Sequence, residues 1–71
     1  MKILLRNRKE KVFYAGEGRW TPATSEAHDF DSGERAIETA LKFRMTDLET
    51  VYYFGDPHLD LAVPIKAAQQ R

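Results

Sequence analysis

The chain has 71 residues, of which 42% are apolar and 31% are charged, and eleven basic side chains balance eleven acidic ones. This length accommodates one small domain, and the apolar content is too high for a disordered chain. The absence of cysteine excludes disulfides, thiol nucleophiles and cysteine-ligated metal centres. A net charge of zero provides no overall attraction to nucleic acid or to an anionic membrane.

Two short β-strands are predicted at the start of the chain. Residues 2–6 and 11–15 are rich in β-branched, aromatic and leucine side chains, whereas residues 7–10 between them are polar. A polar linker of this length joins adjacent antiparallel strands. The first fifteen residues therefore predict a β-hairpin.

A third strand is predicted after a sharp turn at Gly16 and Gly18, where two glycines free the backbone to reverse direction. Trp20 begins this strand and Pro22 interrupts it. Because proline donates no ladder hydrogen bond, we expect the strand to be bulged or to lie at an edge, and to resume near residues 27–30.

The strongest local signal predicts a helix over residues 32–45. Asp31 or Ser32 can cap its first turn, and Asp31 with Glu34 has the spacing of an acidic capping box. The stripe expected to face the core recurs every three or four residues and comprises Ile37, Ala40, Leu41, Arg44 and Leu48.

Two further strands are predicted after this helix. Residues 49–54 contain a run of valine and aromatic side chains with high strand propensity, and residues 55–58 are turn-forming. Residues 59–65 then alternate between apolar and other side chains, with Pro64 at an edge or an end.

These elements predict the α+β class, with an antiparallel sheet of about four to five strands in the order β-β-β-α-β-β and one helix packed on one face. We expect residues 1–66 to form a single domain and residues 67–71 to be a solvated tail. No secretory signal or membrane-spanning run is recognisable, so the expected location is the cytoplasm.

One sequence pattern resembles a group of known domains. The residues that carry it are 13–21, 27–32 and Ala36. They are similar to small uncharacterised bacterial and phage-borne α+β domains built as a hairpin, a Trp-bearing strand, a capped helix and a closing strand. The resemblance implies a fold, and it implies no activity, cofactor or catalytic residue.

Both histidines sit among acidic residues, since His28 precedes Asp29, and His58 lies between Asp56 and Asp60. A histidine beside carboxylates can serve as a general base or a metal ligand. The alternative, which we favour, is that these acids cap the helix, start turns and occupy solvated positions, because a metal site needs three or four ligands. We therefore expect no catalytic residue, no metal and no cofactor, and a protein that is not an enzyme.

Basic side chains are concentrated near the start of the chain, where residues 1–19 hold six bases and two acids. Such a hairpin can contact a phosphate backbone and stack bases on its aromatic rings. The alternative is that lysine and arginine protect the hairpin against edge-to-edge aggregation. The candidate nucleic-acid contacts are Arg6, Arg8, Lys9, Lys11, Arg19 and Trp20.

The predicted strands carry more apolar side chains than one helix can cover. A helix of about fourteen residues is about 21 Å long and shields a single sheet face. We expect the other face to expose a patch that a second copy of the chain or another protein covers. The candidate residues of this surface are Leu4, Phe13, Tyr52 and Phe54. Alternatively, the tyrosine hydroxyls reach water and the C-terminal segment wraps over the remainder.

The leading interpretation is therefore a small, non-enzymatic protein-interaction module that is able to form a homodimer. The alternative is a weak nucleic-acid-binding protein that uses the basic N-terminal hairpin.

Overall fold

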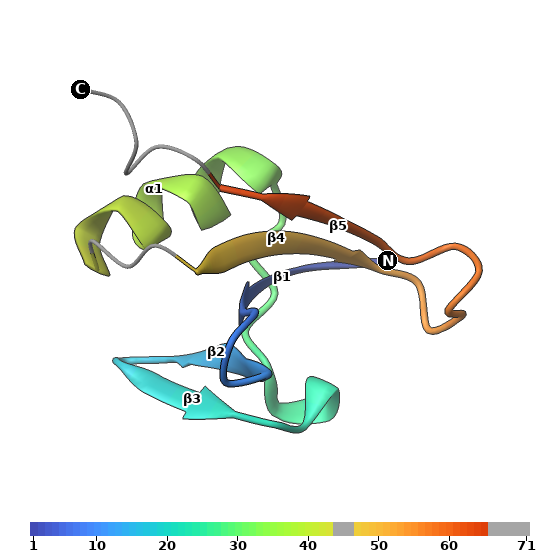
Figure 1. The fold of residues 1–71 in the computed structure, drawn as a ribbon, viewed down its shortest axis with the longest axis horizontal. Helices are drawn as coiled ribbons and strands as arrows, with labels where there is room; N and C mark the ends of the chain where they lie inside the picture. Colours follow the sequence, from blue (N-terminus) through green and yellow to red (C-terminus); the bar gives the residue numbers. More distant parts are fainter. Residues whose placement is uncertain (44–46, 66–71) are drawn as a thin grey trace.

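The computed structural model describes residues 1–43 and 47–65, and within them five antiparallel strands form one sheet with an α-helix packed on it (Figure 1). The predicted α+β class is confirmed. The strands are β1 (Lys2–Asn7), β2 (Val12–Gly16), β3 (Arg19–Thr21), β4 (Leu48–Tyr53) and β5 (Leu61–Pro64). They lie in the order β3-β2-β1-β4-β5, and between β3 and β4 come the short 3₁₀ helix η1 (Thr24–Glu26) and the helix α1 (Gly33–Phe43). The predicted tail at 67–71 lies outside the described residues.

The turn between β1 and β2 is closed by Asn7. Its carbonyl Oδ1 accepts hydrogen bonds from the backbone N–H groups of Lys9 and Glu10, and its backbone carbonyl accepts one from Lys11 at 2.7 Å. Lys11 takes a φ of 59°, in the left-handed region. This side-chain capping explains why a polar stretch without glycine forms the predicted hairpin.

The two strands of this hairpin separate beyond the turn. β1 pairs with β2 only at Arg6–Phe13 and Asn7–Val12, whereas it pairs with β4 along its whole length. Figure 1 shows β2 and β3 splayed away from β1 and β4. The sheet is therefore continuous through β1, β4 and β5 and diverges at β2.

Residues 27–30 are not the resumed strand that the sequence predicts, because they insert into this divergence. The backbone N–H of His28 donates to the Tyr14 carbonyl at 2.8 Å, and the N–H of Phe30 donates to the Ile3 carbonyl at 2.9 Å. The carboxylate of Asp29 accepts the Ile3 N–H at 3.1 Å. The segment thus contacts β2 on one side and β1 on the other, and it follows neither as a regular strand.

Helix α1 begins one residue later than predicted, because Ser32 is its N-cap. The Ser32 hydroxyl accepts the Arg35 N–H at 3.2 Å, whereas Asp31 has a left-handed φ of 69°. The described helix ends at Phe43, and the predicted positions 44–45 lie outside the described residues. Leu48, expected in the helical stripe, instead begins β4 and is buried in the core.

The core between α1 and the sheet combines aliphatic side chains with an aromatic cluster. The Tyr14 ring lies between those of Trp20, Phe30 and Phe43, with centroid distances of 5.5 to 5.8 Å. These offset and edge-on arrangements are the favourable ones for aromatic rings. The buried members of this core are Ile3, Leu5, Phe30, Ala36, Ala40 and Leu48.

Candidate interaction surface

The sheet face away from α1 is not bare, contrary to the prediction of a partner surface there. Leu4 has no exposed surface, and Val51, directly opposite it across β1 and β4, is 7% exposed. Tyr53 lies on the same face, and its hydroxyl lies 3.4 Å from that of Thr24 in η1. The divergence at β2 brings η1 over this face, so Leu4 cannot belong to a surface open to a partner.

Tyr52 was predicted to lie on the same open surface, and this prediction is also wrong. It alternates with Val51 and Tyr53, and its ring packs against the core beneath α1. Its hydroxyl lies so close to Gly33 that a side chain at that position would collide with it. Tyr52 therefore packs beneath the start of the helix and does not belong to an open sheet face.

The other two predicted partner residues differ in their surroundings. Phe13 is half-buried on the face away from α1, where the Arg6 guanidinium lies 5.9 Å from its ring centroid. Phe54 follows the last residue of β4 and is 50% exposed. Of the four predicted residues, Phe54 alone is largely exposed.

The large apolar side chains that are exposed lie mainly on the side of the molecule that carries β5. Leu61 and Val63 of β5 face the same side as Tyr52 and Thr50, their partners in β4, which is the side that carries α1. Because α1 packs over β1 and β4, these two side chains lie beyond it. Among residues 1–43 and 47–65, the exposed large hydrophobic residues are Met1, Ile37, Leu41, Phe54, Leu59, Leu61 and Val63.

Helix α1 contributes its own apolar flank to this region. Ala36 and Ala40 point into the core. At about 100° per residue, Ile37 and Leu41 project to one side of these alanines and Thr39 to the other. Thr39 lines a shallow hollow with Tyr14 and other residues of β2. Ile37 and Leu41 therefore lie on the opposite flank, toward β5, and the prediction that they face the core is wrong, since they are 40% and 49% exposed.

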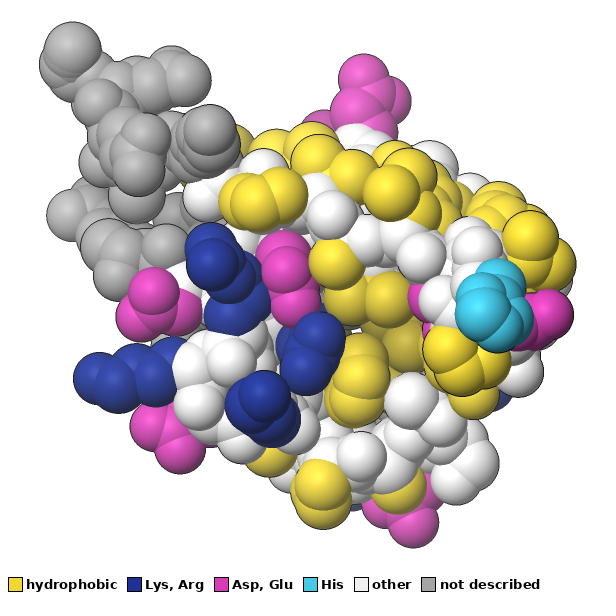
Figure 2. Space-filling model, turned by 45° about the vertical axis from the view of Figure 1, so that its right-hand side comes forward, with side chains coloured by type: hydrophobic (Ala, Val, Ile, Leu, Met, Phe, Trp, Pro, Cys, Tyr) yellow, Lys and Arg dark blue, Asp and Glu magenta, His cyan; other side chains and the backbone are white. Residues whose placement is uncertain are grey.

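We call the four side chains Ile37, Leu41, Leu61 and Val63 the α1–β5 surface. They are between 40% and 57% exposed. Figure 2 shows hydrophobic side chains running along the upper part of the molecule, while basic side chains gather on its lower left. The predicted surplus of apolar strand residues on the face away from α1 is not found there, because Leu4 and Val51 are buried, and the four exposed side chains of the α1–β5 surface are residues that the sequence did not assign to a partner surface.

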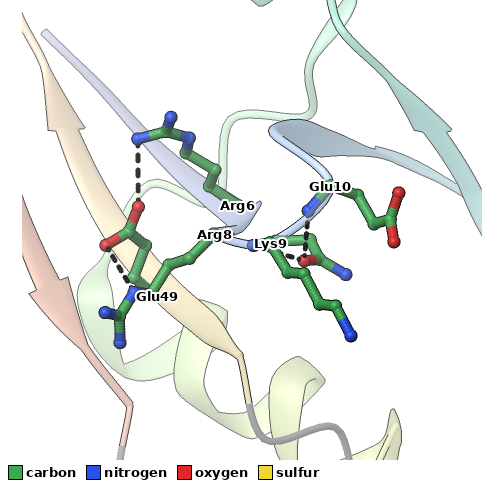
Figure 3. A network of polar contacts seen from close by, with 6 residues as sticks. Arg6, Arg8, Lys9, Glu10 and Glu49 are labelled. Atoms are coloured by element: carbon green, nitrogen blue, oxygen red, sulfur yellow. Dashed lines mark hydrogen bonds and ion pairs between the residues drawn. The ribbon is translucent and has the colours of Figure 1, made fainter.

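The basic residues of the predicted nucleic-acid surface are partly neutralised. Arg6 pairs with Glu49 at 3.1 Å, and Arg8 approaches the other Glu49 oxygen at 3.9 Å (Figure 3). The Glu49 side chain is only 8% exposed. Lys9 and Lys11 are exposed at the turn between β1 and β2. The structure thus brings four of the six candidates to one end of the hairpin.

The other two candidates lie away from this end. Arg19 begins β3 beside the β2–β3 turn, at the opposite end of β2 from Lys11, and its guanidinium lies near the Ala15 carbonyl at 3.5 Å. Trp20 is half-buried and packs on Tyr14 and Phe43 in the core beneath α1. Trp20 pairs with Tyr14 in the middle of β2 and packs against the core, so the tryptophan is not positioned among the basic residues of the turn.

The carboxylates near the two histidines are engaged by the backbone. Asp29 accepts the N–H groups of Ile3 and Asp31, and these hydrogen bonds lower the pKa of its carboxyl below the ordinary value. Asp56 accepts the N–H of His58 at 3.0 Å, and Asp60 accepts that of Phe54 at 2.6 Å. Within the described part of the chain, histidines and acids form no group of three or more suited to hold a metal ion.

No protein-family model, curated protein or solved structure matches this chain significantly. No relative therefore supplies a function or a set of site residues, and the resemblance to bacterial and phage-borne domains stays a prediction. Within residues 1–43 and 47–65, no helix has the length and hydrophobicity needed to cross a bilayer.

Proposed function

We propose that the protein is a small, non-enzymatic protein-interaction module that binds its partner through the α1–β5 surface. The observation that carries this proposal is the grouping of exposed aliphatic side chains on one flank of α1 and on the adjacent side of β5. Scattered apolar residues are normal on protein surfaces, whereas contiguous apolar patches mark binding sites.

The expected affinity follows from the extent of this surface. Fully burying a valine, leucine or isoleucine side chain is worth about 1.5–3 kcal/mol. The four side chains are 40% to 57% exposed, so covering them contributes on the order of 3–5 kcal/mol before the entropic cost of association. We therefore expect moderate affinity, raised by polar contacts at the rim.

The hydrogen bonds accepted by the acidic residues near the histidines support a function without catalysis. Asp29, Asp56 and Asp60 each accept backbone N–H groups that shape a connection or a turn. The carboxylates near the two histidines therefore stabilise the local backbone. The non-enzymatic character remains part of the proposal.

The test is to capture binding proteins from a cell extract with the immobilised wild-type chain. The captured proteins are then compared with those captured by two charge variants. Leu41→Lys combined with Leu61→Lys places two charges in the α1–β5 surface, whereas Lys9→Glu changes a charge in the β1–β2 turn. We expect a reproducible partner to be lost with the double variant and retained with Lys9→Glu. Retention by the double variant together with loss by Lys9→Glu would overturn the proposal.

A second candidate function is nucleic-acid binding, because Arg6, Arg8, Lys9 and Lys11 gather at one end of the hairpin. The nearby Glu49 carboxylate, which pairs with both arginines, reduces the positive charge available to a phosphate backbone. The test is fluorescence anisotropy of labelled single-stranded DNA at two salt concentrations. Binding that weakens with salt and disappears in Lys9→Glu combined with Lys11→Glu would support it, and unchanged anisotropy would exclude it.

A further inference from the structure

We propose that the chain cleaves its own peptide bond between Asp56 and Pro57, in the connection between β4 and β5. This reaction goes beyond the proposed function and is independent of it, because the chain acts once on itself and turns over no substrate. Figure 1 shows this connection projecting beyond the ends of β4 and β5. Three features carry the proposal: the chemistry of the Asp–Pro bond, the position of the Asp56 carboxylate and the hydrogen bonds to the Asp56 carbonyl oxygen.

The two residues of this bond supply the groups that self-cleavage requires. The Asp56 carboxylate can attack the carbonyl carbon of its own residue, because the ring that forms is an unstrained cyclic anhydride. Carboxylates act as nucleophiles of this kind in covalent catalysis. Proline contributes a tertiary amide, whose nitrogen is more readily protonated than that of a secondary amide and leaves more easily. Asp56–Pro57 is the one Asp–Pro bond in the sequence.

The Asp56 side chain is folded back over the bond that it attacks. Its Oδ1 accepts the backbone N–H of His58 at 3.0 Å. Because His58 lies two residues further along the chain, this hydrogen bond closes a turn around the Asp56–Pro57 peptide group. The preceding Gly55 has a left-handed φ of 87°, which residues with a side chain rarely adopt. The turn therefore confines the carboxylate near its target, and such proximity accelerates intramolecular reactions.

The carbonyl oxygen of the same bond accepts two backbone hydrogen bonds. The N–H of Leu59 donates to the Asp56 carbonyl oxygen at 2.8 Å, and the N–H of Asp60 donates to it at 3.0 Å. Donors in this position stabilise the negative charge that develops on the oxygen when its carbon becomes tetrahedral. The Asp60 carboxylate also accepts the Phe54 N–H at 2.6 Å, which ties the two ends of the connection together. The two donors are therefore in place before the reaction begins.

The reaction balances as a hydrolysis that passes through a cyclic intermediate. A bond forms between a carboxylate oxygen of Asp56 and its carbonyl carbon, and the bond from that carbon to the Pro57 nitrogen breaks. The nitrogen takes up a proton from solvent or from the neighbouring His58 imidazolium, and leaves as the amino terminus of a new chain. One water molecule then opens the anhydride and leaves two carboxyl groups on Asp56. Residues 54–59 are exposed, so water reaches this site.

Cleavage at this bond divides the chain into residues 1–56 and 57–71. The first product contains α1 and β4, and the second contains β5. Pairing between β4 and β5 would then hold the second product without a covalent link. The reaction therefore separates the α1 side chains of the α1–β5 surface from its β5 side chains, and the two products have defined masses.

The experiment follows the mass of the purified full chain during prolonged incubation in mildly acidic buffer with protease inhibitors. Folded chain is compared with chain unfolded in guanidinium chloride. We expect the products 1–56 and 57–71, formed at least about tenfold faster in the folded chain, because the fold holds the two donors at the carbonyl oxygen. Equal rates would reveal only the ordinary lability of an Asp–Pro bond and would overturn the proposal, as would the absence of both products from the folded sample.

Variants separate the nucleophile and the leaving group from the shape of the turn. Asp56→Asn keeps a side-chain oxygen for the His58 N–H but cannot form the anhydride, so cleavage should be lost. Pro57→Ala keeps the carboxylate but replaces the tertiary amide, so cleavage should be slower. Asp31→Asn, in the segment before α1, is the matched control and should react at the wild-type rate. Undiminished cleavage of Asp56→Asn would assign the break to a contaminating protease and contradict the proposal.

The anhydride itself is tested by adding hydroxylamine to the wild-type chain during the incubation. Hydroxylamine competes with water for the anhydride, so part of the 1–56 product should carry a hydroxamate on Asp56. Products 1–56 that never carry this group at any hydroxylamine concentration would rule out attack by the Asp56 carboxylate.

Discussion

Leu61 lies directly opposite Tyr52 across β4 and β5, yet Tyr52 packs against the core while Leu61 is 57% exposed. The two side chains share a sheet face, and the difference arises because α1 covers β1 and β4. One strand spacing thus separates a residue that supports the fold from one that is available for binding.

The first prediction follows from this difference. Leu61→Lys should change the free energy of unfolding by less than about 1 kcal/mol, since a half-exposed edge position loses little packing. Leu5→Ala, in the buried core, should cost about 2–5 kcal/mol. Urea denaturation measures both. A loss of several kcal/mol in Leu61→Lys would show that this side chain is part of the core.

The second prediction concerns the contact between Gly33 and the Tyr52 hydroxyl. A Cβ at position 33 would collide with that hydroxyl, whereas the nearest ring carbon lies at an ordinary 3.5 Å. Gly33→Ala should therefore destabilise the chain by about 1–3 kcal/mol, the usual cost of overpacking. In a Tyr52→Phe background, which lacks the hydroxyl, Gly33→Ala should cost little or nothing. A double-mutant cycle in urea measures the coupling, and equal costs in the two backgrounds would contradict the account.

The third prediction separates the two arginines that approach Glu49. Arg6→Ala removes the 3.1 Å ion pair and leaves a carboxylate that is only 8% exposed with a weaker partner at 3.9 Å. It should cost about 1–3 kcal/mol. Arg8→Ala removes a more exposed side chain and should cost less than about 1 kcal/mol. Thermal unfolding of both variants provides the comparison, and similar losses would argue against a dominant Arg6–Glu49 pair.

The fourth prediction is a pH dependence centred on Asp29. Hydrogen bonds from the N–H groups of Asp31 and Ile3 lower the pKa of its carboxyl below the ordinary 3.8. The ionised form therefore stabilises the fold at pH values above 3.8, and this contribution is lost as the pH falls through the lower pKa of the folded state. Asp29→Asn should be less stable than the wild type at pH 7, and the two should converge toward pH 2.

The control for this pH effect is Asp31→Asn. It removes a neighbouring carboxylate, and asparagine tolerates the left-handed φ of 69° at this position. Its acid unfolding curve should parallel that of the wild type. If Asp29→Asn instead follows the wild type at every pH, the carboxylate does not hold the segment between β1 and β2.

Local patterns in the sequence predict most of the elements of this fold. The hairpin, the capped helix and the strand at Leu48–Tyr53 are visible as short-range signals, and the predicted bounds that fall within the described residues agree with the observed ones to within one residue. The prediction over residues 27–30 fails because an extended strand and an extended connection look alike in sequence. What separates them is the divergence of β2 from β1, which depends on distant contacts such as that between Asp29 and Ile3.

The sequence did not predict the residues of the candidate surface. Counting apolar strand residues against a single helix predicts an exposed surplus at Leu4, Phe13, Tyr52 and Phe54, and of these four Phe54 alone is largely exposed. Which apolar side chains are exposed depends on the strand order and on the curl of the sheet. Leu4 is buried as a result, whereas Leu61 and Val63 are exposed. The alternation from Leu59 to Ile65 showed which β5 side chains share a face, but no local signal shows that α1 stops short of them.

The most direct test of the account measures the solvent exposure of individual methyl groups by NMR, using a soluble paramagnetic probe on the methyl-labelled chain. We predict strong broadening of the methyl signals of Leu41, Leu61 and Val63, and protection of those of Leu4 and Val51. The opposite result, with Leu4 and Val51 broadened and the β5 methyls protected, would contradict the claim that the chain presents its apolar surface beside α1.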